Sequence, residues 1–394
     1  MTPTTGEATV RAVNAMTARW ARAAVGERGT VLAAAGVWPL LALLATPAAG
    51  QARAELSAAL GTAPEHAMDE ARALLATVDA MDGAAAAAGV WAARSVELRP
   101  EWRARLPDGA LGELTGDAAA DRAALDAWAS RGTGGLIERM PVATGPGTLL
   151  VLASALLLRT TWETPFAERP LRPAEGPWAG RTLAELYRRT EDGAGLRVHT
   201  TPDGPLTEAR VTGTAGIDVH LLLGPEGVPG GAVLAHGVAA LAGTYPVAPG
   251  ADGNGPGLTL SSVPSHHGRP LTELSTARFT VDADHDLLRW PEVFGLGAAA
   301  SASAGHFPGL AARPLAVSAA RQTATAVFGP LGFRAAAVTA IGMRAAGMAL
   351  PPPRRSPLVT AHFTRPFGFL AVHRASGLVP VAGWVTDPAP YPAV

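Results

Sequence analysis

The order in which helix-like and strand-like segments follow one another constrains the fold of this chain most. Through the first third of the chain, apolar residues recur at helical spacing. Beyond about residue 148 the pattern changes to continuous or alternating apolar runs, as in buried and half-buried strands. Helices are predicted over residues 11–24, 37–45, 51–60, 66–81 and 119–130, and strands over 148–158, 217–223, 278–282, 323–328, 368–373 and 378–384. Helices followed by strands are typical of an α+β domain.

The chain is expected to form a single domain over residues 1–394. No internal repeat is evident. Stretches rich in proline and glycine at residues 170–176, 249–257 and 351–357 are expected to be surface loops. None of them separates two regions of different composition, so none predicts a domain boundary.

The composition excludes several classes of partner and site. Hydrophobic residues make up 48% of the chain and charged residues 16%, which favours a large packed core. The formal net charge is -1, which gives no electrostatic reason to expect nucleic acid or an anionic membrane as a partner. There is no cysteine, so disulfides and cysteine-ligated zinc are excluded. There is also no lysine, which excludes a phosphate-binding loop of the Gly-x-x-x-x-Gly-Lys type.

The uncharged stretch at residues 31–49 has nearly the length of a membrane span. Pro39 and Pro47 interrupt it, and the stretch is rich in alanine, so a buried core helix is the favoured interpretation. The first residues show no secretory leader, and the cytoplasm is therefore the default expectation, with secretion left open.

No arrangement of residues predicts catalysis. The Gly-x-Ser-x-Gly and His-Glu-x-x-His motifs are absent. His266 and His267 are adjacent in a polar turn and are expected to be solvated. His285-Asp286 follows a strand, and we expect Asp286 to cap a helix rather than to form a catalytic dyad. The expectation is a protein without enzymatic activity, cofactor or metal; an enzyme of unrelated fold is the alternative, which a deep pocket lined by histidines and carboxylates would support.

Several segments resemble the serpin family, in the family's order and at its spacing. Residues 363–367 (FTRPF) are similar to "F-x-R-P-F", and residues 382–388 (AGWVTDP) to the terminal "M-G-R-V-x-x-P". Residues 128–137 resemble the end of the family's helix that crosses the main sheet, and residues 156–166 resemble the strand that follows this helix. Further likenesses lie at residues 278–281 with 286–287 and at 306–310. The resemblance is to a divergent, bacterial-type serpin.

The resemblance implies the serpin fold, an α+β architecture in which helices surround a large, mostly antiparallel central sheet. In the family, an exposed reactive-centre loop, here about residues 332–353, is cut by a protease and inserts as an extra strand into the central sheet. Trp162 matches the tryptophan of the breach, the top of the sheet where the loop enters. Ser154 stands where the shutter, the middle of the sheet, usually carries asparagine.

The family's hinge, at the start of this loop, can be matched to this sequence residue by residue. It comprises Gly332, Phe333, Arg334, Ala335, Ala336, Ala337, Val338 and Thr339. Because strand side chains alternate, Phe333 is buried on insertion whenever Ala335, Ala337 and Thr339 are. The alternative interpretation of this stretch is a flexible Ala/Gly loop in an Ala-rich protein.

Four departures from the family pattern put inhibition in question. Phe333 replaces a small residue, and burying it in a filled layer costs roughly 1–3 kcal/mol unless a cavity receives it. Pro330 precedes the hinge and weakens strand pairing. The loop is several residues longer than usual. The segment Ala33-Ala34-Ala35-Gly36 replaces the usual "S-P-x-S", so a thinner polar network is expected at the shutter.

The scissile bond is expected within Met343, Arg344, Ala345, Ala346, Gly347 and Met348. The family distance from Gly332 points to Ala346-Gly347, whereas Arg344-Ala345 suits a trypsin-like protease. Met343 and Met348 suit chymotrypsin-like or elastase-like enzymes. Arg354-Arg355 is a further basic site beside a run of prolines that stiffens the chain.

Two functions follow from the resemblance. The first is a serine-type endopeptidase inhibitor that acts as a suicide substrate through a conformational change, as a monomer whose partner is a serine protease. The second is a non-inhibitory serpin-fold binding protein, which Phe333 and Pro330 favour.

Overall fold

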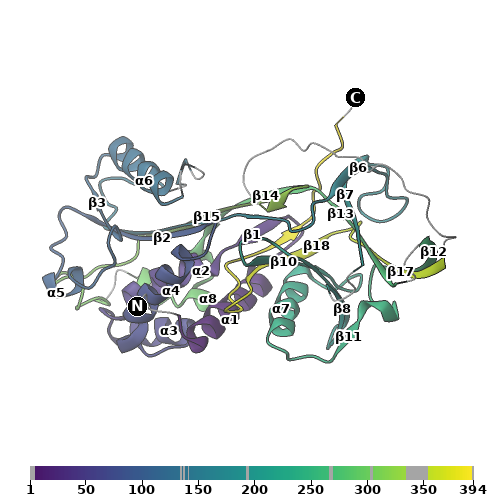
Figure 1. The fold of residues 1–394 in the computed structure, drawn as a ribbon. Helices are drawn as coiled ribbons and strands as arrows, with labels where there is room; N and C mark the ends of the chain where they lie inside the picture. Colours follow the sequence, from purple (N-terminus) through teal and green to yellow (C-terminus); the bar gives the residue numbers. More distant parts are fainter. Residues whose placement is uncertain are drawn as a thin grey trace.

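The computed structural model describes residues 5–133, 135, 138–140, 142–191, 195–265, 269–301, 305–333 and 354–392. Helices α1–α4 gather on one side of a long sheet, and α6 crosses its other face (Figure 1). The helices are α1 (Glu7–Ala24), α2 (Ala34–Ala45), α3 (Gly50–Leu60), α4 (Pro64–Asp79), α5 (Pro100–Arg103), α6 (Ala118–Gly132), α7 (Gly230–Leu241) and α8 (Pro291–Phe294). Short 3-10 turns lie at η1 (Gly250–Asp252), η2 (Leu287–Arg289) and η3 (Ala298–Ala300).

The central sheet runs in the order β3-β2-β4-β15-β16-β5, and β14 pairs with the free edge of β15. Its pairs are antiparallel except β2 with β3 and β4 with β15, which are parallel. Its strands are β2 (Ala84–Ala93), β3 (Leu111–Leu114), β4 (Leu150–Leu158), β5 (Thr160–Thr161), β14 (Phe279–Asp286), β15 (Ala319–Phe328) and β16 (Gly332–Phe333).

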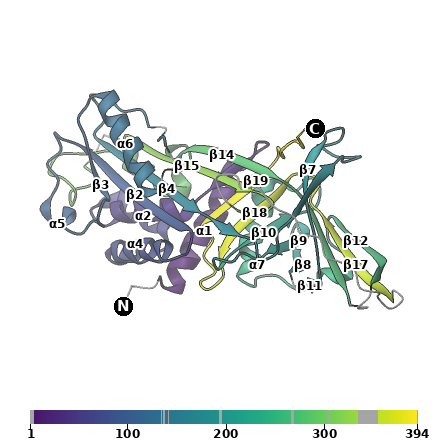
Figure 2. The same cartoon turned by 45° about the horizontal axis from the view of Figure 1, so that its top comes forward.

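Two further sheets lie beyond the central one (Figure 2). The antiparallel sheet β1-β19-β18-β10-β9-β8-β11 carries α7 on one face. Its strands are β1 (Thr30–Leu32), β8 (Leu196–Thr201), β9 (Gly204–Val211), β10 (Ile217–Leu223), β11 (Val247–Pro249), β18 (Phe367–His373) and β19 (Val381–Val385). The third sheet is β12-β17-β13-β7-β6, formed by β6 (Ala167–Leu171), β7 (Leu183–Thr190), β12 (Leu258–Ser265), β13 (Leu271–Ala277) and β17 (Arg354–His362).

The predicted helices and strands are confirmed, with shifted ends. The helix expected at residues 51–60 ends before Gly61, which adopts the left-handed φ of 68° that glycine tolerates at this position. The strand expected at 323–328 begins earlier, at Ala319. The apolar stretch at 31–49 contains α2, which is buried along its whole length. In the part of the chain that the structure describes, no helix is long and apolar enough to cross a membrane.

The loop predicted at residues 351–357 is wrong in its second half. Arg355, Ser356 and Pro357 belong to β17, where they pair with β12. Pairing of β17 with β13 begins only at Leu358, so no described residue pairs with Pro357 on that side of the strand. A proline is tolerated at such an edge position because no ladder hydrogen bond is lost there. The composition suggested a loop, and the neighbouring strand decided otherwise.

Candidate functional site

The candidate site is the space between β4 and β15 in the central sheet. These parallel strands pair from Ala319–Val151 to Gln322–Ser154, and no further pairs form between them although both strands continue. Counting on from Ser154 and Gln322 in this register brings Thr160 level with Phe328. At that level the strands are joined through β16, because Phe333 pairs with Phe328 on one side and with Thr160 on the other. As far as the described residues show, the sheet is therefore closed at one end and bridged at the other, with an unpaired interval between.

The hinge enters the sheet at Gly332 and Phe333. A turn after Phe328 reverses the chain, and the Gly329 N–H donates to the Gly332 carbonyl at 3.0 Å. Pro330 lies in this turn, so the strand-ending role expected of it is fulfilled at the end of β15. A Cβ atom on Gly332 would lie 2.3 Å from the Thr160 carbonyl oxygen, so the close approach of β16 to β5 requires glycine.

Phe333 is already inside the protein, with 2% of its surface exposed. Its ring centroid lies 5.7 Å from that of Phe369. Phe369 in turn stacks on Phe279 at 5.3 Å, and Phe279 stacks on Phe328 at 5.3 Å. An aromatic cluster therefore receives the side chain that was expected to obstruct insertion. Its burial free energy of about 2–3 kcal/mol holds the first two hinge residues in the sheet.

Trp162 lies at the point where the hinge enters. Its N–H donates to the Leu331 carbonyl and its indole Nε1 to the Gly329 carbonyl, each at 2.9 Å. The ring is 3% exposed and contacts Phe328 with centroids 4.8 Å apart. Trp162 thus binds two of the three carbonyls of the turn that precedes β16, in the place where the family resemblance puts the breach.

A half-buried cation lies near this entrance. The Arg188 guanidinium stands over the Phe166 ring at 4.7 Å from its centroid and donates to the Thr164 carbonyl at 3.2 Å. Burial lowers the pKa of Arg188 to about 10. The Phe166 N–H donates to the Pro330 carbonyl at 2.8 Å, so this cluster also supports the turn.

The closed end of the interval is held by a polar network that sequence reasoning missed. Gln322 accepts from the Ala33 N–H at 3.2 Å and donates to the Ala33 carbonyl at 2.8 Å and to Ser154 Oγ at 3.5 Å. All three residues are buried. An inward-facing Gln322 between Ala320 and Ala324 is the signal that identifies this position, because a polar side chain interrupts an apolar face.

His285 completes the link between the sheet and the segment before α2. Its Nε2 lies 2.9 Å from the Val31 carbonyl and 3.2 Å from Thr30 Oγ1. Burial lowers the pKa of His285 and outweighs the opposing bond to Val31, which favours the neutral ring. Asp286 accepts from the Leu288 N–H at 3.2 Å at the start of η2, so the predicted capping role is confirmed.

The remaining predicted positions lie outside the described residues. These are the hinge residues Arg334, Ala335, Ala336, Ala337, Val338 and Thr339 and the candidate scissile residues Met343, Arg344, Ala345, Ala346, Gly347 and Met348. His266 and His267 also lie outside them. Arg355, by contrast, is bound in β17, where its Nη2 donates to the Ser262 carbonyl at 2.6 Å. Among the described residues no cluster of histidines and carboxylates suited to a metal ion occurs.

Residues 12–175 match the protein-family model described as Serpin (serine protease inhibitor). The chain belongs to the serpin family. As a serpin it is a non-enzymatic protein, an inhibitor or a binding protein. No curated protein sequence matches the chain.

Solved structures share this serpin's fold over nearly its whole length. Human thyroxine-binding globulin in complex with thyroxine superposes with a TM-score of 0.73 at 14% identity, covering 97% of this chain and 98% of that one. The native thermophilic serpin tengpin gives 0.72 at 14% identity, with 96% and 93% covered. Native protease nexin-1 with heparin gives 0.70 at 16% identity, with 97% and 99% covered. At such identities the likeness establishes the fold alone, and it includes serpins of different functions.

Proposed function

We propose that this serpin inhibits a serine protease by acting as a suicide substrate. The unpaired interval between β4 and β15 carries the proposal, because it is bordered at one end by a hinge that has already begun to pair. A protease that cuts the loop beyond the hinge frees the segment after Phe333 to continue into the interval. Each added residue then exchanges hydrogen bonds with two strands, and this strand addition drives the change.

The register defines what such a strand would meet. Phe333 pairs with Phe328 and with Thr160, so an antiparallel strand that continues from it brings residue 335 opposite Ala326 and Leu158. Residue 337 comes opposite Ala324 and Leu156. Residue 339 comes opposite Gln322 and Ser154, the first pair of the closed part. Ala335, Ala337 and Thr339 would share the buried side with Phe333, and their small size suits it.

The chemical roles divide between the two proteins. The target protease supplies the nucleophilic serine, and this chain supplies only the scissile peptide. The region from Met343 to Met348 remains our proposal for the cut. The paired state of Arg355 in β17 disfavours the Arg354-Arg355 site, because a protease binds an extended segment that has no strand partner.

Incubation with trypsin-like, subtilisin-like and elastase-like proteases, followed by denaturing electrophoresis, tests the proposal. We expect a covalent complex that resists SDS with at least one protease, at one chain per protease. Mass spectrometry of the released C-terminal fragment then identifies the bond. Simple turnover of the loop, without a complex and without a gain in thermal stability, would exclude this mechanism.

A non-inhibitory binding protein is the second candidate, and the buried Phe333 is the observation that favours it. A hinge held by an aromatic cluster resists release, and the protein would then present a fixed surface to a ligand or partner. Phe333→Thr distinguishes the two, because it loosens the hinge and restores the small residue usual in the family. If Phe333 blocks inhibition, the variant gains trapping of a protease that the parent does not trap. Unchanged trapping would show that Phe333 is not the block.

A further inference from the structure

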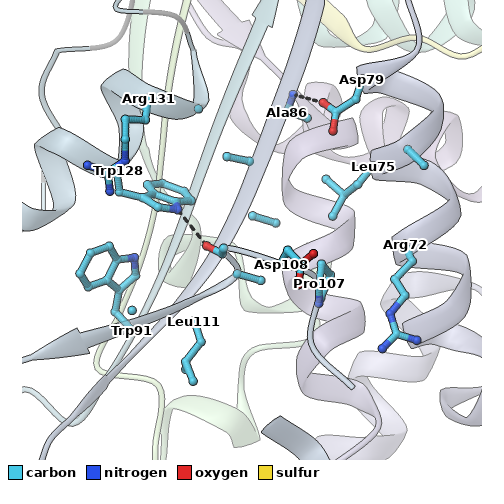
Figure 3. Close-up of a pocket in the computed structure, with 17 residues that line it drawn as sticks. Arg72, Leu75, Asp79, Ala86, Trp91, Pro107, Asp108, Leu111, Trp128 and Arg131 are labelled. Atoms are coloured by element: carbon cyan, nitrogen blue, oxygen red, sulfur yellow. Dashed lines mark hydrogen bonds between the residues drawn. The ribbon is translucent and has the colours of Figure 1, made fainter. Parts of the chain in front are cut away.

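A cavity of about 630 Å³ lies outside the loop-insertion site, between α4, β2, the segment at residues 107–112 and α6. Figure 3 shows its walls: α6 contributes Trp128 and Arg131, α4 contributes Leu75, and Asp108 stands on the side opposite Arg131. Ala86, Ala87 and Ala88 of β2 also line the cavity. We call this cavity the α4–α6 pocket. Its volume is in the range of sites for small organic ligands.

One wall of the pocket holds two indole rings. Trp91 and Trp128 meet edge to face, with ring centroids 6.3 Å apart and planes at 88°. Trp91 is 6% exposed, and its buried Nε1 has no hydrogen-bond partner among the described residues. Trp128 is half-buried and is held through Nε1 by one long bond of 3.3 Å to the Gly109 carbonyl. The wall therefore offers the aromatic face of Trp128, whose indole makes one weak hydrogen bond. It also contains the Nε1–H donor of Trp91, for which the described residues supply no acceptor, and this is unusual for a buried group.

The charges around the pocket balance. Arg72 is committed to Asp69 at 3.1 Å and to the Arg105 carbonyl, and Asp79 accepts from the Ala86 N–H at 3.2 Å. Arg131 and Asp108, among the residues that the structure describes, take part in no ion pair or side-chain hydrogen bond. One free cation and one free anion thus remain on opposite sides. A ligand with a single charge would leave one of them unmatched, whereas a zwitterion matches both.

We propose that the α4–α6 pocket binds a small aromatic zwitterion of the free aromatic amino acid class. The ring lies against Trp128, the carboxylate faces Arg131, and the ammonium group faces Asp108. A small shift of Trp128 gives the carboxylate access to the unpartnered Nε1 of Trp91. The proposal goes beyond protease inhibition and does not depend on it, because none of the described residues that line the pocket belongs to the hinge or to the reactive-centre loop.

Three indole ligands that differ only in charge test the proposal. L-Tryptophan carries both charges, indole-3-propionate lacks the ammonium group, and tryptamine lacks the carboxylate. Titration calorimetry on the intact protein should show L-tryptophan binding at least about tenfold more tightly than either of the others. Equal affinities for all three, or no binding of L-tryptophan at millimolar concentration, would overturn the proposal.

Paired variants assign the two charges. Arg131→Gln should weaken L-tryptophan and indole-3-propionate but leave tryptamine unchanged, and Asp108→Asn should weaken L-tryptophan and tryptamine but leave indole-3-propionate unchanged. Arg122→Gln and Asp82→Asn remove exposed charges outside the pocket and serve as controls. An equal effect of a control and its matched variant would contradict the assignment.

Trp91→Phe tests the unpartnered donor separately, because it keeps an aromatic ring and removes only the N–H and part of the ring. We expect a loss of about fivefold or more in L-tryptophan affinity with the thermal midpoint of the unliganded protein retained. Undiminished affinity in a folded Trp91→Phe protein would show that the indole nitrogen takes no part.

Discussion

Gly332 is the residue on which entry of the hinge depends. A side chain there would place Cβ 2.3 Å from a backbone oxygen of β5, which has no freedom to move aside. Gly332→Ala is therefore expected to release β16 from the sheet, at a local cost of about 1–3 kcal/mol. Limited proteolysis should show cleavage near residue 332 at least about tenfold faster, with the overall unfolding midpoint nearly unchanged. Gly329→Ala is the matched control, since its nearest heavy atom would lie 3.8 Å from the new Cβ.

Glu208 is buried between two histidines on neighbouring strands. It accepts from His199 Nε2 and from His220 Nδ1, each at 2.5 Å. Burial opposes ionisation of Glu208, but the bonds from both histidines outweigh it and hold its pKa far below the usual range. Because the pKa is depressed in the folded state, the stabilisation is present above the unfolded pKa of about 4.5 and is lost as the pH falls below that value.

Glu208→Gln is accordingly expected to lower the free energy of unfolding by about 3 kcal/mol at pH 7, since it breaks a buried charged network. The difference from the parent should shrink between pH 5 and pH 3.5, because only the parent loses stability there by protonation of its unfolded state. Urea unfolding across this range measures both. Glu226→Gln, at a side chain that is 87% exposed, should show neither effect. A difference independent of pH would refute the ionised state of Glu208.

At the scale of elements, the side chain of Gln322 links β15 to the start of α2, where no backbone hydrogen bonds between strands are involved. Gln322 satisfies the N–H of Ala33, the residue that precedes α2 and has no capping side chain of its own. Gln322→Ala leaves this buried N–H without a partner, and the free energy of unfolding should fall by roughly 1–3 kcal/mol. Thr325→Ala, at an exposed position of the same strand, is the control and should change stability by less than about 0.5 kcal/mol. Denaturant unfolding of both variants decides the point.

At the scale of the whole molecule, the described part of the central sheet has an unpaired interval between β4 and β15. A strand that fills the interval forms hydrogen bonds on both sides, on the order of ten in total, at about 1 kcal/mol each. Cleavage in the loop should therefore raise the thermal midpoint by about 10 °C or more, given a few degrees per kcal/mol for a domain of this size. Calorimetry of the cut and uncut protein measures this shift. An unchanged midpoint after cleavage would mean that no strand enters.

Most of the helices and about a third of the strands were predictable. Periodicity located α2, β10 and β18 because each buries a continuous or alternating apolar face, and Gly61 marked a helix end because only glycine adopts a left-handed φ without strain. No expected strand corresponds to β2, β7, β8, β9, β12 or β13. The start of β15 and the whole of β17 were also missed. Both depend on neighbouring strands far away in sequence, and proline-rich composition suggested a loop where β12 provides a partner for Pro357.

The site was predictable in outline. Gly332, Phe333 and Trp162 were identified from the sequence, and the structure brings all three to one end of the central sheet. The burial of Phe333 in the native sheet was not predictable, since it packs against Phe369 from a distant strand. Gln322 and His285 were missed as a network because each bonds to backbone groups about 250 or more residues away.

By itself, the amino-acid sequence determined the α+β class and the resemblance to serpins, because these follow from local periodicity and from short motifs in order. Only the tertiary structure decided that β4 and β15 part beyond Gln322, that Phe333 is buried between them, and that a charged, aromatic pocket lies under α6. Those properties depend on which strands and helices, distant in sequence, become neighbours in space. Local sequence patterns do not specify such contacts.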